Sequence, residues 1–270
     1  MTPAAQIWRQ RELILNFARR ELKSRYKQSL IGWAWSLVNP AATLLIYTLV
    51  FSLIFRGQPP TAGNGRLESY TIYLFIGLVA WNFFAGLLST SMDSLLGAGS
   101  LLKKISFPAF VPVVGNGVSA LVQTGIELGI LVLVLAAVGN LSWVVVFVPL
   151  YFLLLAMFAL GIGLIIALAN VRFRDVSYLV GVALQLLFYA TPIIYPPQLI
   201  PERDVFGVSL RTLFGLNPLS RFVEAIRDLL WFQTLPSLRL AVVLVVLSVG
   251  VFVAGWAIFQ RRSLDVAEYL

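Results

Sequence analysis

The chain has 270 residues, of which 59% are hydrophobic and only 12% are charged. An ordinary soluble domain carries roughly 25% charged residues, so this composition excludes a soluble globular fold and predicts an all-α integral membrane protein. Cysteine and histidine are both absent, which excludes disulfide bonds and thiol catalysis and removes the commonest metal ligands. We therefore expect no catalytic, cofactor-binding or metal site on this chain.

The first segment, residues 1–29, is predicted to form an amphipathic helix. On a helical wheel of about 100° per residue, apolar side chains gather on one half and most Arg and Lys side chains gather opposite. Such a helix lies along a membrane surface, with its cations facing anionic headgroups or a partner. Trp33 and Trp35 follow, and their rings suit headgroup depth. We therefore divide the chain into a cytoplasmic interface helix, 1–29, and a transmembrane domain, 30–270.

Long uncharged stretches follow, and a bilayer core about 30 Å thick needs roughly 20 apolar residues in a helix. The third and fourth of these stretches are separated only by the turn signal GNLS, Gly139 to Ser142, so they are expected to form a tight hairpin. We predict six spanning helices, at about 31–55, 70–92, 108–138, 143–169, 176–195 and 238–260.

The stretch 196–237 is too polar to span a membrane and too apolar to be a solvated loop. Its second half begins with Asn217 and Pro218, a helix cap and a first-turn proline, and apolar residues then recur at helical spacing. A re-entrant or interfacial helix pair on the outer side, between the fifth and sixth spans, satisfies both facts if it packs on protein.

Most of the twenty lysines and arginines lie in the N-terminal segment, the 93–107 loop, the 170–175 turn and the tail. The positive-inside rule assigns these segments to the cytoplasm. With six crossings, both termini are then cytoplasmic in a multi-pass protein of a bacterial cell membrane. This topology accounts for the formal net charge of +8, and no nucleic-acid partner is expected.

The stretch RELKSRYKQSLIGWAWSLVNP resembles the start of the permease subunits of ABC-2 type polymer exporters, and the likeness continues through YTLVFSLIF. The shared positions are Arg20, Leu22, Lys23, Arg25, Tyr26, Gly32, Trp35, Asn39 and Pro40. The resemblance implies a dimer of this chain, bound to two copies of a separate ABC ATPase. It also implies a gate for a lipid-linked polymer, framed by Arg20, Lys23, Arg25, Tyr26, Trp33 and Trp35. Composition alone would favour a simple membrane anchor.

No lysine follows a glycine in the P-loop pattern G-x-x-x-x-G-K-[ST]. We therefore predict that this chain is not an enzyme and that the partner ATPase binds ATP and Mg²⁺. The resemblance implies a coupling helix for that partner at Leu102, Lys103, Lys104, Phe107 and Pro108. A second contact is plausible at Arg172, Arg174 and Asp175.

Each of these two segments has an alternative explanation. The first is also what a basic loop obeying the positive-inside rule would look like. In the second, Arg174 could instead pair within the chain, with Asp175 or with the N-terminal helix.

Glu127 lies well inside a membrane run, where a carboxylate is costly and is a functional candidate by default. A hydrogen bond to Gln123, one turn back, would give it a structural role, and we favour that role. Aromatic residues crowd the first two spans, and sugar rings stack on aromatic faces. Tyr47, Phe51 and Phe84 are candidates to line a polymer pathway, whereas Trp33, Trp35 and Trp81 better suit the interfacial belt.

The leading hypothesis is export of a lipid-linked polymer, with wall teichoic acid as first choice and O-antigen or capsular polysaccharide as the alternative. An exporter of a small drug or lipid is disfavoured by the N-terminal motif. An ion-coupled secondary transporter should show inverted repeats and several intramembrane charges, and neither is found in the sequence. A membrane enzyme is disfavoured because no pair of carboxylates has acid/base spacing beside a phosphate-binding motif.

Overall fold

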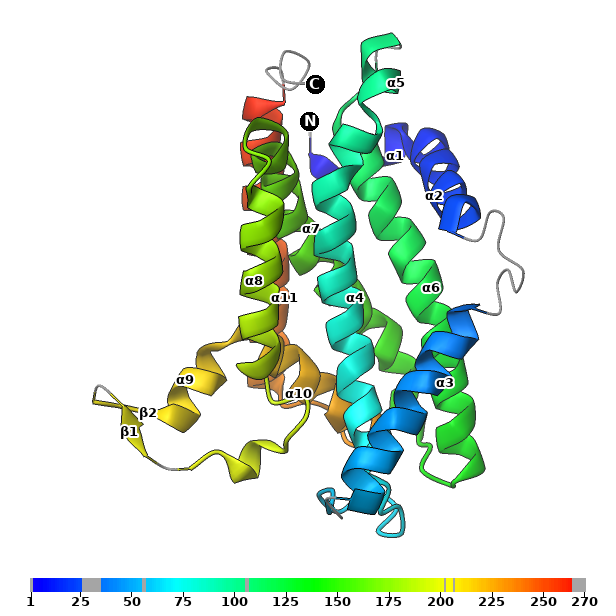
Figure 1. Cartoon of the computed structure of the whole chain (residues 1–270), viewed down its shortest axis with the longest axis vertical. Coiled ribbons are helices and arrows are strands. Elements are labelled where there is room, and N and C mark those ends of the chain that lie inside the picture. Colours follow the sequence, from blue (N-terminus) through cyan, green and yellow to red (C-terminus); the bar gives the residue numbers. More distant parts are fainter. Residues whose placement is uncertain are drawn as a thin grey trace.

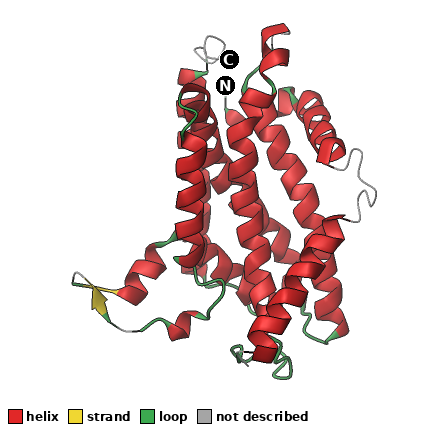
Figure 2. Cartoon of the chain, in the orientation of Figure 1, coloured by secondary structure: helices red, strands yellow, loops and turns green. Residues whose placement is uncertain are grey.

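The computed structural model describes residues 2–25, 35–54, 57–104, 107–201, 203–205 and 207–263. In these ranges the chain is a bundle of helices that run side by side (Figure 1). Figure 2 shows one short ladder of two strands at the edge of the bundle. The predicted class, an all-α membrane protein, is confirmed apart from this ladder.

The predicted interface helix is two helices, α1 and α2, which are separated at Gln10. Strands β1 and β2 are antiparallel. The elements in chain order are α1 (Pro3–Arg9), α2 (Arg11–Arg25), α3 (Trp35–Tyr47), the π-helix η2 (Thr48–Ile54), α4 (Tyr70–Gly97), α5 (Gly99–Lys104), α6 (Phe110–Ala137), the 3-10 helix η3 (Trp143–Phe147), α7 (Val148–Arg172), α8 (Val176–Tyr189), the 3-10 helix η4 (Pro197–Leu199), β1 (Asp204–Val205), β2 (Val208–Ser209), α9 (Leu210–Leu216), α10 (Pro218–Leu230) and α11 (Leu238–Arg262).

Four helical stretches in the described residues are long and apolar enough to cross a membrane. The second, third, fourth and sixth predicted spans correspond to these stretches, Tyr70–Lys104, Phe110–Ala137, Trp143–Arg172 and Leu238–Arg262. The first and fifth predicted spans correspond only to shorter apolar helices, Ala41–Phe51 and Val176–Tyr189. Four spans are therefore supported by length and composition, and the count of six stays a prediction.

The fifth predicted span, 176–195, is shorter in the structure than expected. α8 has 14 residues, which is about 21 Å of helix against a bilayer core of about 30 Å. It ends at Tyr189 because Pro192 follows closely: a proline disfavours helical backbone in the residue before it and has no N–H to donate. The predicted boundary ran past this proline because the residues around it are apolar.

The predicted helix pair between the fifth and sixth spans corresponds to α9 and α10. α10 begins as the sequence predicts: the Asn217 side chain accepts a hydrogen bond from the Leu219 N–H at 3.0 Å, and Pro218 fills the first turn. Its apolar face is buried in the bundle through Phe222, Val223, Ile226, Leu229 and Leu230. Re-entry of the pair into the membrane stays a prediction.

α4 lies at the centre of the bundle. It packs on α6, α7, α8 and α10, and most of its side chains are buried. A helix that is apolar on nearly all sides is typical of such a central position. The other helices are arranged around α4, so its two ends define the two ends of the molecule.

α7 and α11 approach each other closely at two glycines. A Cβ atom at Gly161 would lie 2.5 Å from the carbonyl oxygen of Val251, and a Cβ atom at Gly255 would collide with the carbonyl oxygen of Gly161. Small residues at a helix crossing let the backbones approach, which is a main source of helix association in lipid. A larger side chain at either position must push the two helices apart.

We expect Gly255→Val to destabilise the chain by about 1–3 kcal/mol, because overpacking forces α7 and α11 apart. The measurement is the apparent melting temperature of the purified chain in detergent. Gly250→Val is the matched control on the same helix, because a Cβ atom at Gly250 meets no atom within 4 Å. Equal melting temperatures for the two variants would contradict the importance of this contact.

Candidate transport site

One end of the bundle is basic. α1, α2, α5, the turn before α8 and the end of α11 all lie there (Figure 1). The described basic residues of this end include Arg9, Arg19, Arg20, Lys23, Lys103, Lys104, Arg172, Arg174, Arg261 and Arg262. The prediction that these segments share one side is confirmed, whereas the assignment of that side to the cytoplasm still rests on the positive-inside rule.

The interface helix α2 packs on the start of α6. Ile14 and Ala18 are each 3% exposed, and a Cβ atom at Gly115 of α6 would lie 2.8 Å from the Cβ atom of Phe17. The predicted apolar face is therefore divided between two surroundings. Part of it is buried in the protein, whereas Trp8 and Leu15 remain exposed, as a membrane-surface helix requires.

The predicted gate residues lie partly within the described chain. Arg20 and Lys23 are exposed on α2, and Arg25 is the last residue of that helix. Trp35 is the first residue of α3. Tyr26 and Trp33 lie outside the described residues, so their place at a gate stays a prediction.

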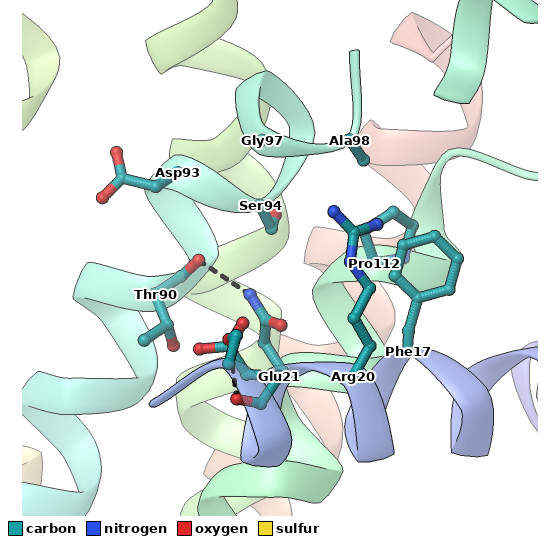
Figure 3. Close-up of a pocket in the computed structure, with 11 residues that line it drawn as sticks. Phe17, Arg20, Glu21, Thr90, Asp93, Ser94, Gly97, Ala98 and Pro112 are labelled. Atoms are coloured by element: carbon teal, nitrogen blue, oxygen red, sulfur yellow. Dashed lines mark hydrogen bonds between the residues drawn. The ribbon is translucent and has the colours of Figure 1, made fainter. Parts of the chain in front are cut away.

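A pocket of about 350 Å³ lies between α2, the end of α4 and the start of α6. Figure 3 shows Arg20 reaching from α2 toward Pro112, with Asp93 at the opposite edge. The Asn116 side chain donates a hydrogen bond to the Thr90 carbonyl oxygen at 3.0 Å, which ties α6 to α4 at this pocket. The pocket combines charged groups with hydroxyl and amide groups and is open to the basic end.

The proposed coupling segment projects from the basic end. α5 extends beyond the ends of the neighbouring helices (Figure 1). Lys103 and Lys104 are exposed on it, whereas Leu102, Phe107 and Pro108 are partly buried. The Phe107 ring lies 5.6 Å from the Phe17 ring, centroid to centroid. The segment after α5 is therefore in direct contact with the interface helix α2.

The second proposed contact, the turn between α7 and α8, is also exposed. The Arg172 guanidinium lies 5.4 Å from the centroid of the Phe173 ring. Asp175 occupies the cap position of α8 without a side-chain capping bond. Within the described residues, Arg174 and Asp175 form no ion pair, so the intrachain pairing considered above is not found there.

The predicted pathway aromatics have two different environments. Tyr47 and Phe51 are partly buried, with ring centroids 5.7 Å apart, and Phe51 stacks further on Tyr70 at 5.8 Å. Phe84, by contrast, is 2% exposed and stacks on Phe158 at 6.0 Å. In this conformation Phe84 belongs to the core of the bundle, and a polymer has no access to it.

Glu127 is partly buried on α6 and hydrogen-bonds the Gln123 side chain, as predicted from their spacing. The two residues line a second, smaller cavity of about 100 Å³ between α4 and α6. In the described part of the chain, no group of three acidic side chains is close enough to hold a metal ion.

A buried arginine at the other end of the bundle was missed by the sequence analysis. Arg227 on α10 is 3% exposed, although the sequence analysis assigned it no role. Its side chain donates hydrogen bonds to the carbonyl oxygens of Pro192 and Ile193, both at 2.7 Å. The burial of Arg227 could have been predicted from its spacing. Arg227 follows Val223, a residue of the apolar face, by one helical turn and therefore lies on the same face of α10.

The Arg227 guanidinium is held on three sides. It lies 3.9 Å from the centroid of the Tyr73 ring, a cation–π contact. Gly77 makes room for it, since a Cβ atom there would lie 2.9 Å from Nη2. Tyr70, which precedes Tyr73 by one helical turn on α4, donates a hydrogen bond from its hydroxyl to the Ile194 carbonyl oxygen. We call Arg227, Tyr73 and the 192–194 turn the outer lock, because they join α4, α10 and the end of α8.

Comparison with known proteins identifies the family. The ABC-2 type transporter family matches residues 12–231 of the chain. The chain belongs to the ABC-2 type transporter family. ABC-2 permease subunits are transmembrane components rather than ATPases, so this permease is not expected to hydrolyse ATP itself.

The permease is similar along its whole length to proteins named for polysaccharide export. It is 28% identical over 264 residues to the O-antigen export system permease protein RfbA of Myxococcus xanthus, and the aligned region covers 97% of each chain. It is 30% identical over 262 residues to the protein of the same name from Klebsiella pneumoniae, with 96% and 95% covered. It is 23% identical to the polysialic acid transport protein KpsM of Escherichia coli over 77% of each chain.

These relatives favour the second of the two substrates considered from the sequence. None of the three is named for teichoic acid, which was the first choice. They are named for O-antigen and for a capsule-type polymer, polysialic acid. The preference for teichoic acid is therefore not supported.

We expect Arg227→Met to lower the stability of the permease by about 3 kcal/mol or more, because two buried carbonyl groups lose the hydrogen bonds that Arg227 donates to them. The measurement is the apparent melting temperature in detergent, followed by tryptophan fluorescence. Arg221→Met on the same helix is the control. Arg221 is more exposed: it pairs with Glu224 at 3.0 Å and donates a hydrogen bond to the Gly215 carbonyl oxygen at 2.9 Å, so its loss should cost only about 1 kcal/mol. Similar losses in both variants would contradict the outer lock.

We expect Asp228→Asn to stabilise the permease at pH 7 but not at pH 4. Burial raises the pKa of the Asp228 carboxyl from 3.8 to about 6, and the neighbouring Glu224 carboxylate adds to the rise. The folded chain therefore binds this proton more tightly than the unfolded chain, so the charged form costs stability above about pH 6 and the cost disappears below about pH 4.

The shift corresponds to about 3 kcal/mol, which we reduce to about 1 kcal/mol because the carboxyl is partly exposed and solvent screens it. The measurement is the apparent melting temperature at the two pH values. The control is Asp204→Asn, because Asp204 is exposed on β1. An equal gain at pH 4 and pH 7 would contradict the electrostatic explanation.

Proposed function

We propose that this chain is the membrane subunit of an ATP-driven exporter that moves a lipid-linked polysaccharide of the O-antigen type outward across a bacterial inner membrane. The observation that carries the proposal is the similarity over 97% of the chain to a protein named as an O-antigen export permease. Capsular polysaccharide is the second candidate, and it is supported by the lower identity to the polysialic acid transport protein.

The partner is proposed to be an ABC ATPase in two copies, which would bind ATP and Mg²⁺. Three features of the basic end support this arrangement. α5 projects from the bundle and exposes Lys103 and Lys104, the turn at Arg174 and Asp175 is exposed at the same end of the bundle, and the sequence has no P-loop. We infer that α5 is the element that transmits movement of the ATPase.

A second copy of this chain is proposed to complete the transport path. α8 supports this proposal because none of its residues is buried in the single chain. Its exposed apolar side chains include Tyr178, Leu179, Val182, Leu186 and Tyr189. Packing of this face on another copy would leave the path between the two subunits, near Tyr47 and Phe51.

The contact between Phe107 and Phe17 supplies a physical route from ATPase to gate. A displacement of α5 moves Phe107, and Phe107 packs on α2, which carries Arg20 and Lys23. Because packed aromatic side chains cannot be compressed, α2 has to follow that movement. We infer that this coupling opens the polymer entrance at the membrane surface, and that the lipid part of the substrate remains in the bilayer.

The proposal predicts that a P-loop ATPase co-purifies with the tagged chain, at one ATPase per copy, from its own membranes in mild detergent. The double variant Lys103→Glu, Lys104→Glu should lose most of this ATPase and export less polysaccharide, because it reverses the charge of the exposed end of α5. Mass spectrometry measures the first result, and the amount of surface polysaccharide measures the second.

Arg261→Glu with Arg262→Glu is the matched control, since it changes the same charge at the same end of the bundle. Normal ATPase recovery and export in the α5 variant would contradict the coupling role of this helix. Absence of any ATPase from the unaltered chain, in preparations where other membrane complexes survive, would overturn the proposed function.

A further inference from the structure

A row of polar residues follows the seam between α4 and α6, two helices that lie within predicted spans. On α4 the polar residues at helical spacing are Asn82, Thr90 and Asp93, and Gly86 lies on the same face between the first two. On α6 the facing residues are Asn116, Gln123, Thr124 and Glu127. The two helices run in opposite directions, so Asp93 and Asn116 lie near the basic end, and Asn82 and Glu127 lie deeper.

The two cavities of the chain described above lie on this seam, one after the other. The larger one, about 350 Å³, ends at Thr90 and Asn116, and the smaller one, about 100 Å³, begins one helical turn further along each helix, at Gly86 and Ala120. The hydrogen bond from Asn116 to Thr90 lies between them. The two cavities are therefore separate neighbours along one seam, and we call the stretch of α4 and α6 that lines them the polar seam.

The polar seam reaches about halfway through the membrane. The eleven residue steps from Asn82 to Asp93 correspond to about 16 Å of helix, and a bilayer core is about 30 Å thick. Amide and carboxyl groups that faced lipid here would be costly. On α11 the exposed side chains at this depth are apolar, as Val246, Val249 and Val253 are, and Gln185 is a single exposed polar side chain on α8. The polar seam is therefore built for water or for a polar ligand.

We propose that the polar seam binds a hydroxyl-rich, uncharged stretch of the exported polysaccharide. Amide and carboxyl oxygens accept hydrogen bonds from sugar hydroxyls, and amide N–H groups donate to them. The larger cavity also has the volume of a typical small-ligand site. This inference rests on the proposed function and specifies the substrate chemistry of that transport path.

The charges along the polar seam select against an anionic polymer. Its described lining contains three carboxyl groups, on Glu21, Asp93 and Glu127, and one cation, on Arg20. A phosphate-bearing or acidic polysaccharide would meet carboxyl groups of like charge at both ends of the polar seam, which is unfavourable. A neutral glycan avoids this repulsion.

Cysteine labelling can test the polar seam, because the chain has no cysteine of its own. Gly86→Cys places a thiol in the polar seam, where a Cβ atom meets no atom within 4 Å. Gly250→Cys is the matched control, because it is equally free of contacts but lies among the exposed valines of α11. With the chain in lipid nanodiscs, a charged, water-soluble thiol reagent should label Gly86→Cys and leave Gly250→Cys unlabelled.

Protection by two glycans then tests the ligand chemistry. Maltoheptaose, a neutral probe, should slow the labelling of Gly86→Cys. At a concentration equal to its apparent Kd, half of the sites are occupied, so the labelling rate should fall by about twofold. Sulfated maltoheptaose at the same concentration should not slow it. Failure of the reagent to label Gly86→Cys, no protection by the neutral glycan, or equal protection by both would each overturn the proposal.

The same preparations separate this inference from the proposed function. Recovery of the ATPase with Gly86→Cys shows that the exporter still assembles, so a negative labelling result then counts against the polar seam alone. Loss of the ATPase from the unaltered chain counts against the proposed function, whatever the labelling shows. Single, monodisperse peaks in size-exclusion chromatography exclude misfolding as the cause in either variant.

Discussion

The structure depends on one constraint: polar groups inside a membrane bundle must find partners within the protein or line a hydrated cavity. Arg227 meets this constraint by donating hydrogen bonds to the carbonyl oxygens of Pro192 and Ile193. These oxygens lie in a turn, where Pro192 prevents the helix from continuing. Asn140 meets it at the tip of the hairpin, where its side chain donates to the carbonyl oxygens of Leu230 and Trp231. Both residues join α10 to the rest of the bundle, so polar contacts position the outer end.

The basic end is organised differently, because its charged groups are exposed and its contacts are apolar. Ile14 and Ala18 are buried against α6, and Phe17 packs on Phe107. The interface helix is thereby attached to the segment that follows α5. An exporter driven from outside the membrane needs such a mechanical connection, and the exposed lysines of α5 are free of the packing that holds α2. The two ends of the bundle thus differ: buried polar contacts hold one end together, whereas the other end exposes basic side chains.

The polar seam runs from the basic end partway into the bundle and bears on the choice of substrate. Full-length similarity to proteins named as O-antigen export permeases supports the proposed class of polymer, and the carboxyl groups of Glu21, Asp93 and Glu127 support the proposal of an uncharged member of that class. The favoured polymer is therefore not the phosphate-rich teichoic acid first preferred from the sequence.

The sequence by itself determined what local patterns encode: the membrane class, four long spans, the hairpin at Gly139, the cap at Asn217 and the pairing of Glu127 with Gln123. Each follows from residues within a few turns of one another. Pro192 already marks the end of α8 in the sequence, although the predicted span ran past it. Only the tertiary structure decided that Phe84 belongs to the core and that Arg227 is buried on Tyr73. These features depend on residues far apart in the chain, such as Arg227 and Pro192, which meet only after the helices have packed.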